Sequence, residues 1–144
     1  MKLGAQATYS TINIGDDLPV VTTRVSLDLF RRYGGLGGDD ASHHVSEEAA
    51  ARTPYGKPIA QGVLTESFIS VALTRWLADP TGWIAGGSLK CKLTAPVWAN
   101  DLLTVRGTVI AKDVEGDPRY VTCQMTVENQ DGKVVCAGEA KARV

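Results

Sequence analysis

The residues best suited to chemistry lie in one short segment, Gly38 to Ser46, which reads GDDASHHVS. It contains two adjacent acids, Asp39 and Asp40, and two adjacent histidines, His43 and His44, which are the only histidines in the chain. An aspartate and a histidine on one short segment can hold a water molecule between them and exchange protons with it. Histidine suits this task because its unperturbed pKa lies near neutrality. The segment therefore indicates an acid–base site, but residue types alone do not choose among the acid–histidine pairs.

Two other interpretations fit the same residues. Asp and Ser side chains in loops commonly bond to nearby main-chain groups, so the segment could be a solvated polar loop. Alternatively, Asp40 and His44 stand four residues apart and could share a helical face as metal ligands. The glycines of the preceding stretch, Tyr33 to Gly38, disfavour a continuous helix, and the chain offers no further histidine as a ligand.

A second feature of chemical interest is Gln61-Gly62, which opens the longest helical pattern of the chain, residues 61–79. The N–H of a glycine at the positive end of a helix can hold a developing oxyanion. Glycine is equally common at an ordinary helix boundary. Within the pattern, Ser67 and Ser70 interrupt the apolar residues, and each either bonds to a carbonyl of its own helix or faces a polar site.

The elements that would position these groups follow from the hydrophobic pattern. The 61–79 helix is apolar on most of its circumference, which predicts that neighbouring elements surround it. Alternating residues predict four consecutive antiparallel strands after it, at 88–97, 102–112, 120–129 and 134–143. An earlier strand is expected at 18–25, and short helices are expected after the caps Ser26 and Ser46, the first stopped by the glycine-rich stretch. We therefore predict an α+β fold, with an antiparallel sheet wrapped around one central helix.

Length and composition place these elements in one domain, residues 1–144, with 44% hydrophobic and 22% charged residues. The net charge of −1 argues against a nucleic-acid surface or a polybasic membrane patch. Three dispersed cysteines without a C-x-x-C pair argue against a zinc ribbon or a disulfide framework. The N-terminus lacks the apolar run of a signal peptide, and no run is long enough for a membrane span. We therefore expect a cytoplasmic protein.

The order of the motifs resembles the signature of MaoC-like (R)-specific enoyl-CoA hydratases and 3-hydroxyacyl-thioester dehydratases. That signature begins with an aromatic residue, followed by the motif Gly-Asp-x-Asn-Pro-x-His-x-Asp. A short Ala-rich helix, a Phe/Tyr-Gly turn and the motif Ile-Ala-His-Gly-Met/Leu come next. It corresponds here to Tyr33–Leu64. Two later stretches are also similar to the family: its Pro-Val-x-x-x-Asp strand pair matches LTAPVWANDLLTVRGTV, and its closing hairpin matches VENQDGKVVCAGEAKARV. The resemblance covers nearly the whole chain. It implies a hot-dog fold, an antiparallel sheet curled around one apolar helix, in a homodimer or higher oligomer with active sites near the interface.

Carried over residue by residue, the resemblance implies a role for each motif. The catalytic pair falls on Asp39 and His44, and the backbone N–H that serves as oxyanion donor falls on Gly62. Ser70 matches a serine that often lies near the aspartate, and Gln61 takes the supporting position before the glycine. The implied reaction is reversible syn addition of water across the trans-2 double bond of an acyl thioester. The substrate carries its own pantetheine, on CoA or acyl carrier protein, so the resemblance implies no cofactor and no metal.

The chain departs from the signature at several positions. Ala41-Ser42 replaces Asn-Pro, Ser46 replaces the following aspartate, and Gln61 replaces a histidine. The loss of proline removes a rigid turn from the loop. Asp40 and His43 fall at variable positions of the signature and are expected to face outward.

The fold leaves two other functions open. Hot-dog thioesterases usually rely on a carboxylate on or near the central helix, and Glu66 is the candidate for that role here. A non-catalytic subunit that binds acyl groups or supports a catalytic partner would tolerate the altered loop.

Overall fold

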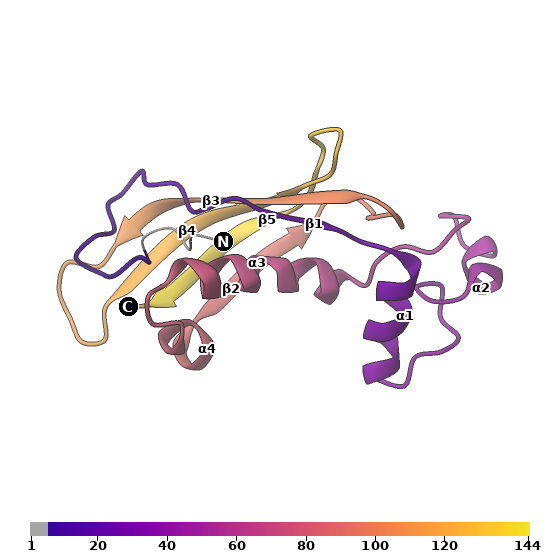
Figure 1. Ribbon diagram of the computed structural model, residues 1–144, viewed down its shortest axis with the longest axis horizontal. Helices are drawn as coiled ribbons and strands as arrows, with labels where there is room; N and C mark the ends of the chain where they lie inside the picture. Colours follow the sequence, from indigo (N-terminus) through magenta and orange to yellow (C-terminus); the bar gives the residue numbers. More distant parts are fainter. Residues whose placement is uncertain (1–5) are drawn as a thin grey trace.

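The computed structural model describes residues 6–144, which form an antiparallel sheet with one long helix along its face (Figure 1). The five strands have the spatial order β1-β3-β4-β5-β2. They are β1 (Val21–Arg24), β2 (Ser88–Leu93), β3 (Leu102–Lys112), β4 (Tyr120–Glu128) and β5 (Val134–Arg143). The helices are α1 (Leu27–Leu36), α2 (Glu47–Ala51), α3 (Gly62–Trp76) and α4 (Thr81–Gly86). The α+β arrangement predicted from the sequence is therefore confirmed.

The core lies between α3 and the inner face of the sheet. Alternate residues of β3 and β4 point inward and are buried: Leu103, Val105, Val109, Val121, Cys123, Met125 and Val127. They face a buried stripe on α3 that includes Leu64, Ile69 and Leu73. Within α3, Val63 and Arg75 are the exposed residues, so neighbouring elements cover most of this helix. This agrees with the nearly all-round apolar pattern of its sequence.

Several boundaries differ from those predicted. The strand expected at 18–25 is reduced to β1, and before it Leu18 still donates its N–H to Gly107 O, 2.8 Å away. Pro19 has no N–H to offer to a longer ladder. The long helix ends at Trp76, and the separate short helix α4 was not predicted.

The first helix runs through two glycines that were expected to stop it, and it ends at Leu36. Ser26 caps its start by accepting a hydrogen bond from the Leu29 N–H at 3.0 Å. A Cβ atom on Gly34 would lie 3.0 Å from both the Asp39 main-chain oxygen and Val45 Cγ1. Glycine at this position therefore lets the following loop lie close against α1.

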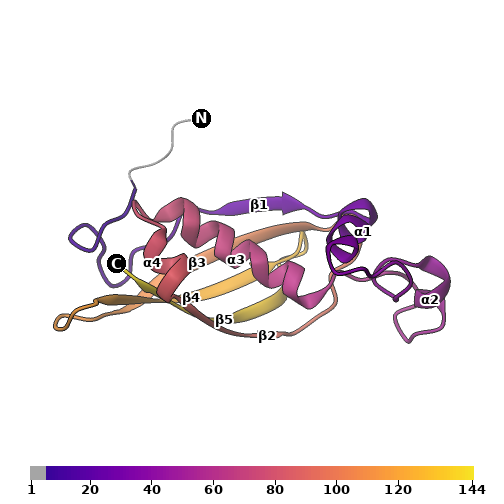
Figure 2. The same ribbon diagram turned by 90° about the horizontal axis from the view of Figure 1, so that it is seen from below.

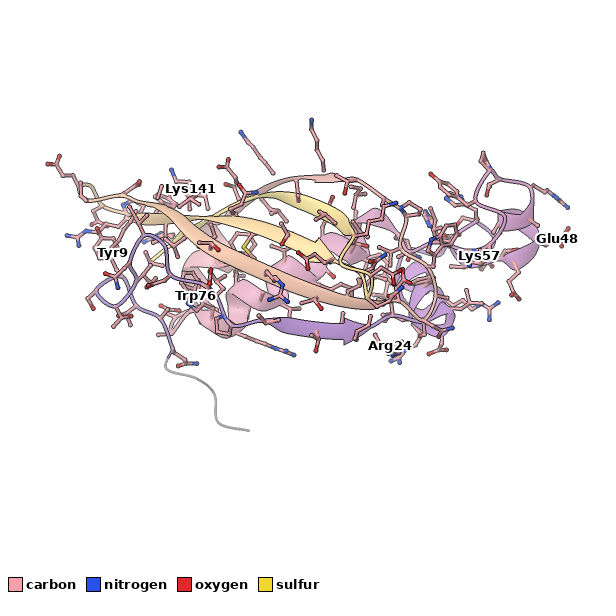
Figure 3. All side chains as sticks on the ribbon, turned by 90° about the horizontal axis from the view of Figure 1, so that it is seen from above. Tyr9, Arg24, Glu48, Lys57, Trp76 and Lys141 are labelled. Atoms are coloured by element: carbon pink, nitrogen blue, oxygen red, sulfur yellow. The ribbon has the colours of Figure 1, made fainter. Side chains whose placement is uncertain are left out.

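The segment that carries α1 and α2 projects beyond the end of the sheet, at the end of the molecule where α3 begins (Figures 1 and 2). Glu48 and Lys57 mark this end, and Trp76 lies toward the other end (Figure 3). The projecting segment returns to the body through a bridge between Ile59 and Trp98. The main-chain N–H of Ala60 also donates to Val97 O at 2.9 Å. The 38–46 segment, which carries the candidate acid–base residues, therefore lies outside the sheet, in a projection that is anchored to the sheet.

The cysteines are free thiols, as the sequence indicated. Cys123 and Cys136 are buried in the sheet, and burial is the main cause that raises the pKa of each thiol to about 12. Such thiols pack as small apolar side chains rather than as nucleophiles. Among residues 6–144, no helix combines the length and apolar composition required to cross a membrane.

Candidate active site

The 38–46 segment is a series of turns between α1 and α2. The Asp39 N–H donates to Gly34 O at 2.9 Å, and Arg31 Nε donates to Val45 O at 3.1 Å, so α1 holds the segment near both ends. Because the segment is not helical, Asp40 and His44 do not share a helical face. In the described part of the chain, no group of three or more His, Cys, Asp or Glu side chains is arranged to hold a metal ion.

The carboxylate of Asp39 is surrounded by donors from its own loop. The Ser42 hydroxyl donates to Oδ2, and Oδ1 accepts the main-chain N–H groups of Ser42 at 2.9 Å and of Ala41 at 3.3 Å. The Ser42 side-chain bond is the largest cause that lowers the pKa of Asp39, followed by the Ser42 N–H, and the nearby His44 contributes in the same direction. Asp39 is therefore held as a carboxylate on the loop that also carries His44.

The ring of His44 is held by the main chain of a distant segment. Its Nδ1 lies 2.8 Å from the carbonyl oxygen of Ile59. A carbonyl oxygen only accepts, so Nδ1 carries the proton, and in the neutral ring Nε2 is the free acceptor. His44 can therefore take up a proton at Nε2 while Nδ1 keeps its orientation.

The expectation that His43 faces outward is wrong. Its ring centroid lies 4.0 Å from that of His44 and 6.3 Å from that of Tyr55, and all three residues line the same pocket. Asp40 is exposed, as expected. A second imidazole therefore lies against the candidate catalytic histidine because the short turns fold both rings toward the start of α3.

The pocket that contains His44 has a volume of about 430 Å³ and reaches the first residue of α3, Gly62. Its other lining residues come from the 55–65 and 93–97 segments and include Tyr55, Ile59, Thr65 and Leu93. The N–H of Gly62 belongs to the first turn of the helix, where main-chain donors have no partner inside the helix. A Cβ on Gly62 would lie 2.3 Å from Leu93 Cδ1, so glycine allows β2 to approach the helix start.

Gln61 and Asp39 line a neighbouring hollow of about 400 Å³, together with residues of α1. Gln61 Nε2 donates to Phe30 O at 2.9 Å and ties the start of α3 to α1. Its Oε1 is buried and has no hydrogen-bond partner among residues 6–144. Gln61 thus joins α1 to the hollow that Asp39 lines, and its Oε1 acceptor is unused within the described residues.

The serines of α3 make contacts away from this pocket. Ser67 Oγ donates to Leu64 O of its own helix at 2.6 Å. Ser70 Oγ accepts the Trp83 indole N–H at 2.8 Å, and this bond joins α3 to α4. Neither serine lines the pocket of His44 or the hollow of Asp39. Among residues 6–144, Ser70 therefore joins α3 to α4 about two turns beyond the start of α3, and it does not line the hollow of Asp39.

Two contacts that organise the site were missed by sequence reasoning. Ser42 holds Asp39, and the spacing Asp-x-x-Ser is a local signal of such a turn because short polar side chains bond to main-chain groups a few residues away. The Ile59 carbonyl, by contrast, has no sequence signal because every residue carries one.

Comparison with known proteins places the chain in a family. The model of the MaoC like domain matches residues 12–131. An (R)-specific enoyl-CoA hydratase of Rhodospirillum rubrum is 33% identical over 136 residues, which span 94% of this chain and 90% of that protein. A 3-hydroxybutyryl-CoA dehydratase of Methylorubrum extorquens is 32% identical over 112 residues, 78% of this chain and 68% of that protein.

The fold is shared with solved structures of the same kind. The R-hydratase PhaJ1 from Pseudomonas aeruginosa, in its unliganded form, superposes with a TM-score of 0.78 at 26% identity. The match covers 94% of this chain and 84% of that one. The antiparallel sheet with one long helix packed along its face is therefore the hot-dog fold that the resemblance implied. The chain belongs to the MaoC-like dehydratase family.

Proposed function

We propose that this protein is a hydratase and dehydratase that adds or removes water across the trans-2 double bond of an acyl-CoA, with the hydroxyl at C3 in the (R) configuration. The observation that carries the proposal is that His44 and Gly62 line one pocket, while Asp39 lies on the same loop and is linked to the main chain of His44 through Ser42. An acid–base pair and a free helix N–H are the groups that such an addition requires. The names of the related proteins point to the same reaction class.

In the hydration direction, Asp39 and His44 would bind the attacking water between them. One proton of the water passes to the pair as its oxygen bonds to C3, and a proton is delivered to C2 of the substrate. The thioester oxygen gains negative charge in the intermediate enolate, and the Gly62 N–H donates to it. The Nε2 of His44 is suited to the proton exchange, because the Ile59 carbonyl holds Nδ1 and leaves Nε2 as the acceptor of the neutral ring.

A lysine close to Tyr55, which lines the pocket, suits the phosphate groups of a CoA thioester. Tyr55 lies edge-on to Trp98 with ring centroids 6.3 Å apart, and Lys57 Nζ lies 4.7 Å from the Trp98 ring centroid. Within residues 6–144, Lys57 forms no salt bridge, so its charge is available to a phosphate group. We extend the proposal to acyl carrier protein thioesters as a second carrier, and to a homodimer as the active assembly.

The position of Glu66 does not favour a thioesterase. Glu66 does not line the pocket of His44, and instead its charge adds to burial in raising the pKa of the Cys91 thiol on β2. A carboxylate that lies near Cys91 and does not line the pocket is not placed to attack a thioester held at Gly62.

The decisive experiment is an assay of the purified protein with short trans-2-enoyl-CoA substrates. Loss of the enone absorbance with formation of the (R)-3-hydroxyacyl-CoA supports the proposal. Release of free CoA thiol from the same substrates, without hydration, would establish a thioesterase instead. If neither product forms until a second protein is added, the chain is a partner-dependent subunit.

A further inference from the structure

Ser42 contacts both members of the candidate dyad. Its hydroxyl donates to Asp39 Oδ2 and its main-chain N–H donates to Oδ1 at 2.9 Å. The same Oγ atom accepts the main-chain N–H of His44 at 3.2 Å. One side chain therefore joins the Asp39 carboxylate to the main chain at His44 through two consecutive hydrogen bonds.

A proline, which stands at this position in the family signature, makes none of these contacts. Proline has no main-chain N–H, and its ring has neither a donor nor an acceptor. The signature fixes its loop through the restricted backbone of proline, whereas this chain has lost that restriction at Ser42. At this position, three hydrogen bonds of Ser42 take the place of the covalent constraint of a proline ring. Two of them go to the ionised Asp39 carboxylate, and hydrogen bonds to charged groups are stronger than those between neutral groups.

We propose that Ser42 is a positioning residue, whose hydroxyl and N–H fix the Asp39 carboxylate relative to His44. This inference rests on the proposed dyad. Both oxygens of Asp39 already accept at least one hydrogen bond from the loop, so the orientation of the carboxylate is set before a substrate arrives. A water bound to Asp39 then meets lone pairs in a fixed direction, and effective acid–base catalysis requires such alignment.

The groups around Asp39 allow its titration to be followed separately. His44 lies on the same loop and influences the Asp39 charge, and Tyr33 from α1 lines the same hollow. Gln61, from the start of α3, is neutral, and the adjacent Asp40 is exposed. Of these groups only His44 contacts Ser42, and it does so through its main-chain N–H rather than through its ring.

The test compares Ser42→Ala, Ser42→Thr and the control Ser46→Ala. Alanine removes only the hydroxyl, so we expect kcat for enoyl-CoA hydration to fall about tenfold or more, with KM changed much less. The hydroxyl favours the charged carboxylate, so its loss raises the pKa of Asp39 and moves the acid limb of the kcat profile to higher pH. Threonine keeps the hydroxyl and should restore both the rate and the profile.

Ser46 caps α2 through the Ala49 N–H at 3.2 Å and makes no bond to Asp39. Ser46→Ala should therefore lower stability without moving the acid limb, which separates positioning from general loosening of the loop. An unchanged kcat and pH profile in a folded Ser42→Ala protein would overturn the inference, as would failure of threonine to restore them.

A readout that does not depend on activity separates this inference from the proposed function. NMR titration of the Asp39 side-chain carboxyl carbon should show a higher midpoint in Ser42→Ala than in the unaltered protein. If the unaltered protein is inactive but the midpoint shifts, the proposed function fails and Ser42 still positions Asp39. If the midpoint does not shift, Ser42 does not hold the carboxylate, whatever the activity.

Discussion

The Nδ1–H of His44 donates to the main-chain oxygen of Ile59, fifteen residues further along the chain, across 2.8 Å. Ile59 in turn bridges to Trp98 in the segment that leads into β3. The tautomer and orientation of the proposed catalytic imidazole therefore depend on how the projecting segment is anchored to the body of the fold. A substitution can test the ring chemistry while keeping this anchor.

His44→Asn is the substitution that makes this distinction. The asparagine amide nitrogen can take the place of Nδ1 and donate to Ile59, but the side chain has no group equivalent to Nε2 that exchanges protons near neutrality. We expect a folded protein whose kcat for enoyl-CoA hydration is about two to four orders of magnitude lower. Activity close to that of the unaltered protein would show that Nε2 does not take part.

Asp39→Asn should reduce hydration by a similar factor, because the amide keeps the shape of the side chain but removes the charge and the proton affinity of the carboxylate. Asp40→Asn is the matched control, since it makes the same chemical change one residue away on an exposed side chain. Steady-state rates for the pair decide the assignment. A loss in Asp40→Asn but not in Asp39→Asn would mean that the motif order chose the wrong aspartate, and equal losses would contradict a role specific to Asp39.

Gly62→Pro tests the oxyanion donor. Proline removes the N–H and is well tolerated at the first position of a helix, and the preceding Gln61 already has the extended backbone that proline favours (φ −60°, ψ 137°). We expect kcat to fall about a hundredfold to a thousandfold. Gly62→Ala is the control, because its Cβ crowds Leu93 as the proline would but the N–H is kept. If alanine lowers kcat as much as proline does, the loss reflects crowding and not the donor.

The stability contributed by Asp39 should depend on pH in a defined direction. The pKa of Asp39 is lowered in the folded protein, chiefly by the Ser42 hydroxyl. The stabilisation is therefore complete above the unfolded pKa of about 3.9 and is lost as the pH falls through the lower folded value. Urea unfolding should show a larger difference between the unaltered protein and Asp39→Asn at neutral pH than near pH 3. A difference independent of pH would contradict the assigned hydrogen bonds.

Asp101→Ala should destabilise the protein, although Asp101 does not line the pocket of His44. Asp101 is 6% exposed, and its carboxylate accepts the Trp98 N–H at 2.9 Å and the Gln130 side-chain N–H at 3.0 Å. Removing it leaves the half-buried Trp98 N–H without its partner and a cavity at the buried Asp101 position, with an expected loss of about 1 kcal/mol in the free energy of unfolding. Urea denaturation measures this loss, and Asp131→Ala, at an exposed turn position, should change stability by less than about 0.5 kcal/mol.

The sequence by itself determined most of the elements, α4 excepted, and the order of the chemical groups. Alternation of apolar residues located β3, β4 and β5 almost to the residue, and Ser26 and Ser46 located the starts of α1 and α2. These features are local, because the period of a strand and the cap of a helix are set by residues only a few positions apart. The motif order likewise assigned the proposed catalytic pair to Asp39 and His44, and this assignment stays a prediction.

Only the tertiary structure decided how those groups are held. It brings the Ile59 carbonyl to His44, Leu93 to Gly62, and His43 into the pocket that its sequence position did not suggest. It also places β2, the second strand in sequence, at the sheet edge beside β5. Main-chain carbonyls are identical along the chain, and the pattern of one strand does not name its neighbour. These contacts are therefore fixed by the packing of the whole chain and cannot be predicted from any local pattern.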